Sequence, residues 1–387
     1  MTARPTAFTG AAIHDGTTLH RDKALLVTGD TARLTTPDRL PEGCTVTRLD
    51  GGTILPGFVD LQLNGGGGVM FNHAPDLDTL HTIAEAHARC GSAAILPTLI
   101  TDTPARTRAA IDAVSQAIDA RIPGIVGIHL EGPHLSVARK GAHDPALIRR
   151  MEPDDLALLL SAAERLPNVL VTVAPETTDT AQIRALANAG ITVALGHTDA
   201  DFDTCMAAFD AGARAVTHLF NAMSQLGNRE PGLVGATLAR GDVHAGLIAD
   251  GIHVHPATMR AALAAKTGPG AIFLVTDAMA TAGSEIDRFT LNGREVLRRD
   301  HRLTLADGTL AGADLTLTRA LQVMTRDVGE PLEAAIRRAT TGPAALLRDP
   351  GSFGTLAQGA ASLLYLAADG TSHRPLLAAA APERRSA

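Results

Sequence analysis

Apolar and polar residues alternate along this chain in two different ways, and the change comes near residue 56. From Thr6 to Leu55, short apolar runs are broken by turn residues such as His14-Asp15-Gly16, which predicts short strands joined by tight turns. After residue 56, apolar runs alternate with Ala-rich stretches whose apolar positions recur at helical spacing. The first part therefore predicts a small β structure, and the second part predicts an alternating α/β fold.

Eight apolar runs in the second part have the length and composition of buried parallel strands. They are Phe58–Leu63, Ala93–Leu99, Ile125–Leu130, Val169–Ala174, Ile191–Leu195, Ala215–Thr217, Ala245–Ile248 and Ile272–Val275. Amphipathic stretches lie between most of them, among them Thr79–Arg89, Pro104–Ala120, Gln182–Ala189 and Pro256–Ala265. Eight such units that close on themselves form a TIM (β/α)8 barrel. An open doubly wound sheet is the alternative, but no G-x-G-x-x-G follows the first strand.

Short strands return after the eighth run, in Asn292–Leu305, and helical stretches follow at Leu315–Asp327 and Pro331–Arg338. The segment from Phe353 to Leu366 again has the pattern of strands and turns that the first 55 residues show. We therefore predict two domains. Residues 1–55 and 352–387 form a small β-sandwich, and residues 56–351 form the barrel.

Composition narrows the class of protein. With 45% hydrophobic and 19% charged residues, the 387-residue chain can bury a large core. The formal net charge of −7 argues against nucleic acid as the main partner, although a local group of Arg and His can still bind an anionic substrate. The three scattered cysteines argue against a disulfide framework. No apolar run approaches the ~18 residues of a membrane span, so we expect a cytoplasmic protein.

Residue types that carry chemistry follow the predicted strands. Glu131 comes after the third strand, His197 after the fifth, His218 after the sixth and Asp277 after the eighth. Gln62 and Asn64 lie at the end of the first strand, Glu176 lies just past the fourth, and Asp250 and His253 follow the seventh. Active sites of TIM barrels lie at the carboxyl ends of the strands, so we expect these side chains to meet at one mouth. Unpaired ionisable groups are costly there unless a cation compensates them.

One Glu and two His leave an open coordination position for water, which is the pattern of a catalytic metal site. A metal held by Glu131, His197 and His218 lowers the pKa of that water toward ~7. Asp277 then acts as general base, and later as general acid toward a leaving amine. The donor set suits zinc, iron, cobalt or manganese. For Glu176, Asp250 and His129 we keep the more ordinary interpretation of a structural or solvated side chain.

A series of short motifs occurs in order between about residues 50 and 320. They are Pro56-Gly57-Phe58-Val59-Asp60, Gln62-Leu63-Asn64-Gly65, Leu130-Glu131-Gly132-Pro133, Lys140-Gly141-Ala142-His143, Gly196-His197-Thr198, Thr217-His218-Leu219-Phe220-Asn221-Ala222-Met223, Asp250-Gly251-Ile252-His253 and Thr276-Asp277-Ala278. Together they resemble the N-acetylglucosamine-6-phosphate deacetylases of the amidohydrolase superfamily. The resemblance implies hydrolysis of the N-acetyl amide of N-acetylglucosamine 6-phosphate to glucosamine 6-phosphate and acetate, in amino-sugar catabolism and cell-wall sugar recycling.

The resemblance also implies roles for individual residues. Many amidohydrolases carry His-x-His on the first strand and bind two metals, whereas Gln62-x-Asn64 stands here and resembles the single-metal branch. One zinc or iron ion would be held by Glu131, His197 and His218. Gln62 would contact this ion through a water molecule. Asp277 would be the acid/base. His143 would polarise the acetyl carbonyl and stabilise the oxyanion.

The substrate contacts rest on the resemblance as well. It implies that the sugar and its phosphate are bound by Asn64, Ala142, His143, Asn221, the Ala222 backbone, Arg229 and His253. It implies a homodimer in which Arg229 acts on the neighbouring subunit's phosphate, because the guanidinium matches two phosphate oxygens at once. Considered alone, Arg229 is a surface arginine. Two alternatives stay open: another amidohydrolase (a cyclic amidase, a deaminase or a deacetylase of a related amino sugar), or a barrel that binds ligands without a metal.

Overall fold

The barrel consists of eight parallel strands, and each of the eight apolar runs forms one of them. The computed structural model describes residues 4–379, and its barrel strands are β8 (Phe58–Leu63), β11 (Ser92–Ile100), β12 (Ile128–Glu131), β13 (Val169–Val173), β14 (Thr192–Leu195), β15 (Ala215–Val216), β16 (His244–Ile248) and β17 (Ile272–Val275). They pair in sequence order. The seam closes where Asn64 N–H donates to the Ala278 carbonyl at 2.7 Å and Asp277 N–H donates to the Gln62 carbonyl at 2.9 Å. The predicted barrel is confirmed.

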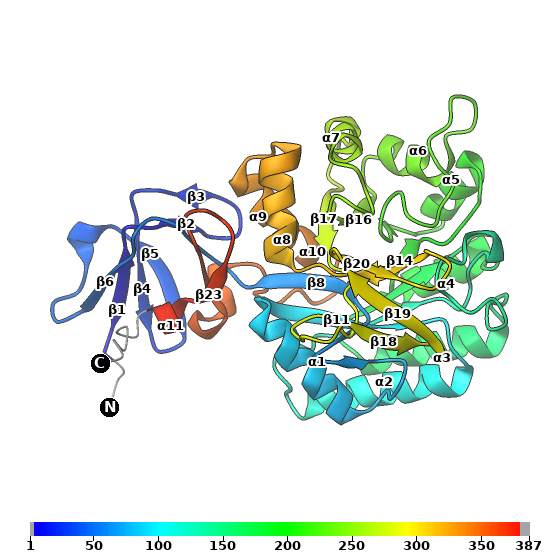
Figure 1. Ribbon diagram of the computed structural model, residues 1–387, viewed down its shortest axis with the longest axis horizontal. Helices are drawn as coiled ribbons and strands as arrows, with labels where there is room; N and C mark the ends of the chain where they lie inside the picture. The colour runs from blue at the N-terminus through cyan, green and yellow to red at the C-terminus, as the bar shows by residue number, and fades with distance from the viewer. Residues whose placement is uncertain (1–3, 380–387) are drawn as a thin grey trace.

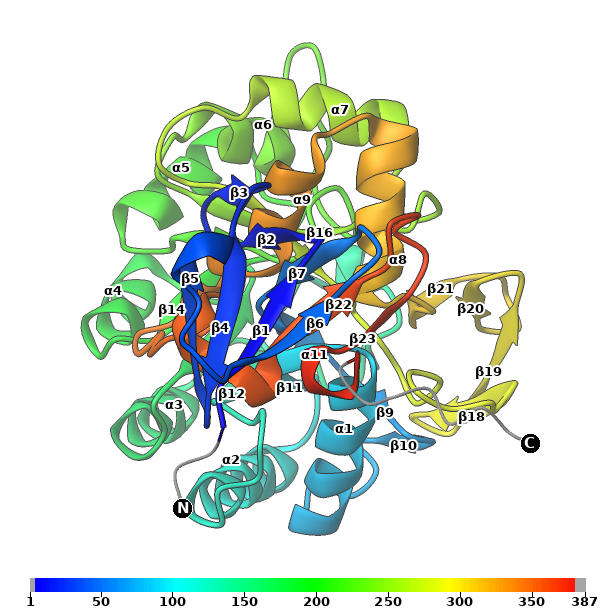
Figure 2. The same cartoon turned by 90° about the vertical axis from the view of Figure 1, so that its left-hand side faces the viewer.

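Helices after the strands form a ring outside the barrel, which Figure 2 shows end-on with the small domain in front. They are α1 (Leu77–Arg89), α2 (Pro104–Asp119), α3 (Pro153–Arg165), α4 (Thr180–Asn188), α5 (Phe202–Asp210), α6 (Gly232–Ala239), α7 (Pro256–Ala265), α8 (Leu317–Gln322, continued by η3, Val323–Val328), α9 (Leu332–Ala339) and α10 (Thr341–Ala344). Several begin at a side-chain cap: Asp76, Thr103, Asp179 and Asp201 each accept a backbone N–H from the third helical residue.

The small domain is a sandwich of two sheets (Figure 1, left). One sheet has the order β5 (Thr31–Thr35), β4 (Ala24–Thr28), β1 (Thr6–Thr9), β6 (Thr45–Arg48), and the other has β23 (His373–Pro375), β22 (Leu364–Leu366), β7 (Thr53–Leu55), β2 (Ala12–His14), β3 (Leu19–His20). Because β22 pairs with β7, the two ends of the chain share a sheet. A sandwich built from both chain ends is therefore confirmed. The division at 55/56 and 351/352 stays a prediction, and its residues 1–3 and 380–387 lie outside the described residues.

A separate four-stranded sheet lies between β17 and α8 in the chain. It is antiparallel and consists of β18 (Arg288–Leu291), β19 (Arg294–Arg299), β20 (Arg302–Thr304) and β21 (Leu310–Ala313). Its residues Leu291, Val296 and Leu303 pack with Ile100 and Met279 of the barrel in a separate apolar cluster. The sequence predicts strands here, but not that they cover one side of the barrel mouth (Figure 1).

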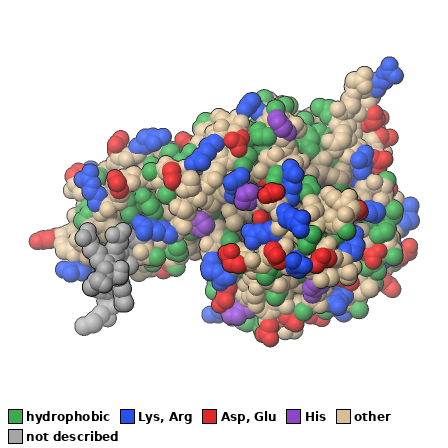
Figure 3. Space-filling view, viewed as in Figure 1, with side chains coloured by type: hydrophobic (Ala, Val, Ile, Leu, Met, Phe, Trp, Pro, Cys, Tyr) green, Lys and Arg blue, Asp and Glu red, His purple; other side chains and the backbone are tan. Residues whose placement is uncertain are grey.

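The face of the molecule shown in Figure 3 carries charged side chains of both signs. Lys and Arg are interspersed with Asp and Glu over this face. Among residues 4–379, no helix is both long enough and apolar enough to cross a bilayer. All three cysteines, Cys44, Cys90 and Cys205, are free thiols.

Candidate active site at the barrel mouth

Glu131, His197 and His218 meet at the carboxyl ends of their strands. Glu131 is the last residue of β12, and the two histidines follow β14 and β15 within two residues. Glu131 Oε1 lies 3.1 Å from His197 Nε2 and 3.0 Å from His218 Nε2, and the two Nε2 atoms are 3.1 Å apart. All three side chains are buried. Three donor atoms from distant parts of the chain thus face one point.

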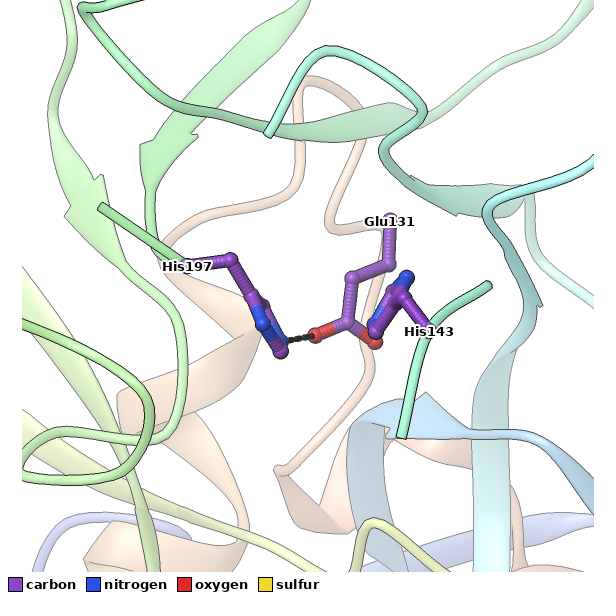
Figure 4. A group of neighbouring side chains, drawn as sticks. All are labelled: Glu131, His143 and His197. Carbon is purple, nitrogen blue, oxygen red and sulfur yellow. Dashed lines mark hydrogen bonds and ion pairs between the residues drawn. The ribbon is translucent and has the colours of Figure 1, made fainter. Parts of the chain in front are cut away.

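His143 completes the group from the loop after β12. Figure 4 shows Glu131, His143 and His197 turned toward one another from separate segments, and one potential ligand atom from each lies within 4.8 Å of the others. The imidazole rings of His143 and His197 are 4.4 Å apart between centroids. Gly141, two residues before His143, also lies against His197: a Cβ there would lie 3.3 Å from His197 Cε1, and the left-handed φ of 53° favours glycine. By proximity alone, His143 is a ligand candidate alongside His218.

The charge of Glu131 and the orientation of His197 suit a cation. Burial alone would raise the pKa of Glu131, but the close Nε2 atoms of His197 and His218 outweigh it and hold that pKa well below its usual value. His197 Nδ1 lies 2.8 Å from the Arg139 carbonyl oxygen, to which an Nδ1–H donates, and this leaves Nε2 as the free ligand atom. A buried carboxylate with two imidazole Nε2 atoms around one point is a donor set that fits a divalent metal.

Asp277 follows β17 and faces the same cavity. Asn64 Nδ2 donates to Asp277 Oδ1 at 2.7 Å, and Gln62 Nε2 lies 3.4 Å from the same oxygen. Burial, and next the negative charge of Glu131, raises the pKa of Asp277 to about 6. A carboxyl group with a pKa near neutrality can both take up and release a proton at physiological pH, as an acid/base catalyst must.

The backbone is strained where these side chains are placed. His197, His218 and Asp277 have φ angles of 47°, 30° and 50°, and Ala222 beside them has 49°. Left-handed φ is uncommon in residues other than glycine, and it tends to cluster at functional sites where the surrounding structure enforces it. All four of these residues line the cavity at the barrel mouth.

A cavity of about 400 Å³ opens above the cluster. Most of the sequence-predicted site residues line it: Asn64, Glu131, Ala142, His143, His197, His218, Asn221, Ala222, His253 and Asp277. Met279, Leu291 and Leu310 give it an apolar wall, two of them from the β18–β21 sheet. The cavity is therefore polar and ionisable at its floor and apolar on one side, as small-molecule sites commonly are.

Two predicted residues do not line this cavity. Gln62 is buried at the floor, with Nε2 3.4 Å from both Glu131 oxygens. Arg229 is exposed on the long segment between β15 and α6, which projects from the barrel (Figure 1). Arg229 is not among the residues that line the cavity of its own chain. The exposed position agrees with the plain interpretation of a surface arginine and leaves its proposed role to a second subunit.

His129, Glu176 and Asp250, for which the sequence favours a structural or solvated role, make hydrogen bonds that agree with that role. His129 Nε2 pairs with Thr172 Oγ1 at 2.8 Å inside the barrel, and burial lowers the pKa of His129 to about 4, so the ring is neutral. Glu176 accepts from Thr198 Oγ1 and Asp199 N–H. Asp250 Oδ2 lies 2.6 Å from His253 Nδ1, which orients the histidine that lines the cavity.

Sequence reasoning missed three supports of the site. Asp60 accepts from Thr276 Oγ1 at 2.5 Å and so ties β8 to the residue before Asp277; burial raises the pKa of Asp60 to about 7. The Arg139 carbonyl carries no sequence signal, because every residue has one. Thr101, whose hydroxyl lies 2.7 Å from His143 Nδ1, did carry a signal: it is the polar residue after the second strand.

Comparisons with known proteins agree with this geometry. A model of the amidohydrolase family matches residues 53–370. An N-acetylgalactosamine-6-phosphate deacetylase from Shewanella sp. (strain ANA-3) is 44% identical over 312 residues, which cover 81% of this chain and 78% of that protein. The structure of an N-acetylglucosamine-6-phosphate deacetylase from Pasteurella multocida has a TM-score of 0.88 at 33% identity, covering 94% of this chain and 96% of that one. A point mutant of the Mycobacterium smegmatis N-acetyl-D-glucosamine-6-phosphate deacetylase, in complex with N-acetyl-D-glucosamine 6-phosphate, has a TM-score of 0.86 at 32% identity, covering 95% and 96%.

Proposed function

The chain belongs to the amidohydrolase family, and on that premise we propose that it hydrolyses the N-acetyl amide of N-acetyl-D-glucosamine 6-phosphate to D-glucosamine 6-phosphate and acetate. The observation that carries the proposal is the convergence of Glu131, His197, His218 and Asp277 on one cavity. Proteins similar over most of their length are named deacetylases of amino-sugar 6-phosphates. The activity would serve amino-sugar catabolism and cell-wall sugar recycling in the cytoplasm.

In this proposal Glu131, His197 and His218 hold one divalent cation, zinc or iron in the first place, with cobalt and manganese also suited. When bound, the cation activates a water molecule at neutral pH and polarises the amide carbonyl. One ion is proposed and not two, because the first strand presents the neutral amides of Gln62 and Asn64 instead of two imidazoles. Gln62 contacts the cation at most through a water.

Asp277 moves the protons. Its carboxylate accepts a proton from the attacking water as the new C–O bond forms at the carbonyl carbon. It then donates that proton to the amide nitrogen as the C–N bond breaks, so acetate and the free amine leave. Asn64, which donates to Asp277 Oδ1 at 2.7 Å, holds the carboxylate in one orientation through both steps. His143 donates to the carbonyl oxygen, where negative charge develops.

The sugar and its phosphate are proposed to bind above this floor. Asn221, the Ala222 backbone and His253 line the cavity and supply donors. Arg229 would come from a neighbouring copy in a homodimer. On the same projecting segment Leu226 is 59% exposed, and an exposed leucine beside an exposed arginine suits a segment that a second copy covers.

Acetate release tests the proposal. Purified protein loaded with zinc or iron is assayed on N-acetylglucosamine with and without the 6-phosphate. We expect the phosphorylated sugar to be strongly preferred, since charge-assisted hydrogen bonds to phosphate are among the stronger contacts in proteins. Equal rates on both sugars would refute the phosphate assignment, and no acetate from either would refute the deacetylase.

N-acetylgalactosamine 6-phosphate is a second candidate substrate, because the 44% identical relative is named for it. The two sugars differ only in the configuration at C4, so the amide, the phosphate and the chemistry at Asp277 are the same. The ratio of kcat/KM for the two sugars separates these candidates. A preference for the galacto form would correct the substrate and leave the mechanism unchanged.

A further inference from the structure

Thr101 makes a buried contact with His143 that no step described so far uses. The residue follows β11 directly, and its Oγ1 lies 2.7 Å from His143 Nδ1. The exposed fractions of the two residues are 1% and 4%. Gly132 leaves room for the hydroxyl: a Cβ there would lie 2.4 Å from Thr101 Oγ1, and the backbone φ of 86° favours glycine as well. The contact is thus built into the junction of β11, β12 and the loop that carries His143.

The contact can be made in two ways, because a neutral imidazole has one ring proton. In the first, Nδ1–H donates to the hydroxyl oxygen and Nε2 keeps a lone pair. In the second, the hydroxyl donates to Nδ1 and the ring proton sits on Nε2. A positively charged ring would also carry a proton on Nδ1, so it would make the same contact as the first form.

The surroundings of the hydroxyl select the second form. Within residues 4–379, His143 Nδ1 is the hydrogen-bond partner found for the Thr101 side chain, and no other lies in range. If the hydroxyl accepted from Nδ1, its own proton would be buried without an acceptor, which is unfavourable. If it donates, both groups are satisfied by a single bond.

We propose that Thr101 is a positioning residue whose hydroxyl donates to His143 Nδ1 and thereby keeps the ring proton on Nε2, where it donates to the amide carbonyl of the substrate. The inference rests on the deacetylation proposed above. It also separates His143 from the metal ligands: an Nε2 that carries a proton has no lone pair for a cation, although the ring lies close to Glu131 and His197.

The chain contains a matched control. Thr318 Oγ1 lies 2.7 Å from His373 Nδ1, the same pair of atoms at the same distance, between α8 and β23. Thr318 is also buried, at 5% exposure, and neither residue lines the active-site cavity. Thr318→Val removes the same bond without touching the reaction.

The test uses the metal-loaded full-length chain with 15N-labelled histidine. The tautomer of His143 is determined by NMR from the ring nitrogens, with the signals assigned by their loss in His143→Gln. We expect the Nε2–H form in the unsubstituted protein and in Thr101→Ser, and loss of this preference in Thr101→Val. For Thr101→Val we further expect kcat about 100-fold lower with KM within about threefold, as for loss of one oxyanion donor, and unchanged metal content. Thr101→Ser should keep kcat within about threefold, and Thr318→Val within about twofold.

Three results would overturn the proposal: an Nδ1–H tautomer in the unsubstituted protein, an unchanged kcat in Thr101→Val, or loss of the metal from Thr101→Val or His143→Gln. The tautomer is measured without substrate and without a variant at Thr101, so it decides the question even if Thr101→Val does not fold. Failure of the deacetylase itself would instead appear as absence of acetate release from the unsubstituted enzyme.

Discussion

The core of the β-sandwich and the mouth of the barrel bury opposite kinds of side chain. The sandwich core is apolar, with Phe8, Ile13 and Leu25 completely buried. The mouth buries ionisable groups such as Glu131 and His197, which are no more than 4% exposed. Burial of apolar surface stabilises a fold, whereas burial of ionisable groups costs free energy unless partners compensate them.

The backbone is also more strained at the mouth than in the described part of the sandwich, where no residue other than glycine has a left-handed φ. At the mouth, three non-glycine residues that carry the proposed chemistry have left-handed φ angles, His197, His218 and Asp277. Such strain persists only where the rest of the structure enforces it. The sandwich and the barrel wall therefore supply stability, and the mouth uses part of it to hold reactive groups in place. Substitutions should therefore separate cleanly into those that change turnover and those that change stability.

Asp277→Asn should give the largest effect. Asparagine keeps the shape of the side chain but cannot transfer the proton, so we expect kcat to fall about 10⁴-fold, equivalent to about 5 kcal/mol. Because the change removes a buried negative charge near Glu131, Tm should not fall. Steady-state kinetics and thermal unfolding of the same metal-loaded sample measure both. A small loss of kcat would show that another group transfers the proton.

Phe8→Ala, in the sandwich core, should lower stability and leave turnover nearly unchanged. Removing a completely buried phenylalanine should lower the free energy of unfolding by about 3–5 kcal/mol. We expect kcat at 25 °C to stay within about twofold, since the side chain is far from the cavity. Denaturant unfolding and kinetics test this. A kcat loss as large as the stability loss would mean that the two regions are coupled.

Arg229→Ala should have a smaller and more selective effect. Loss of a guanidinium–phosphate contact should raise KM for the phosphorylated sugar by about 30-fold, equivalent to about 2 kcal/mol, and leave the unphosphorylated sugar unaffected. Arg184, an exposed arginine on α4, is the matched control, and Arg184→Ala should leave KM unchanged. The oligomeric state of both variants is measured by light scattering. An unchanged KM in an Arg229→Ala dimer would remove Arg229 from the phosphate site.

Of the effects considered, the smallest is expected in the pH dependence of kcat/KM, which should decrease on the acid side as Asp277 is protonated. Asp277 must be ionised to act as a base, and burial raises its pKa to about 6. The base form is therefore lost as pH falls through this value, and kcat/KM should decrease about tenfold per pH unit below it. A bound cation lowers the pKa, so the acid limb should lie at or below pH 6. Asn64→Ala removes the donor to Asp277 Oδ1 and should move the limb upward.

The sequence predicts the barrel well, because the pattern that identifies each strand lies within the residues of that strand. Parallel strands covered on both faces consist of continuous apolar residues, so β8 and β13, buried at every position, are recognisable without knowledge of their neighbours. The position of the β18–β21 sheet over the mouth was not predictable, because it depends on packing against Met279 and Ile100. Local pattern predicts elements, whereas long-range packing decides where an inserted sheet lies.

The site could be predicted to the extent that function depends on residue type at strand ends. Glu131, His197, His218 and Asp277 could be found this way, and the structure brings them to one cavity. The groups that orient these side chains could not be predicted, because many residues carry the same groups. They are the carbonyl of Arg139 and the hydroxyl of Thr101. Arg229 was assigned by resemblance, and its place depends on a contact between copies that one chain does not contain.

The central claim is that Glu131, His197 and His218 hold a single divalent cation and that His143 does not. Metal content per chain, measured on purified protein and on Glu131→Gln, His218→Gln and His143→Gln, tests it most directly. We expect about one ion per chain in the unsubstituted protein and in His143→Gln, and little metal in the other two variants. Two ions per chain, or a His143→Gln variant without metal, would contradict the account.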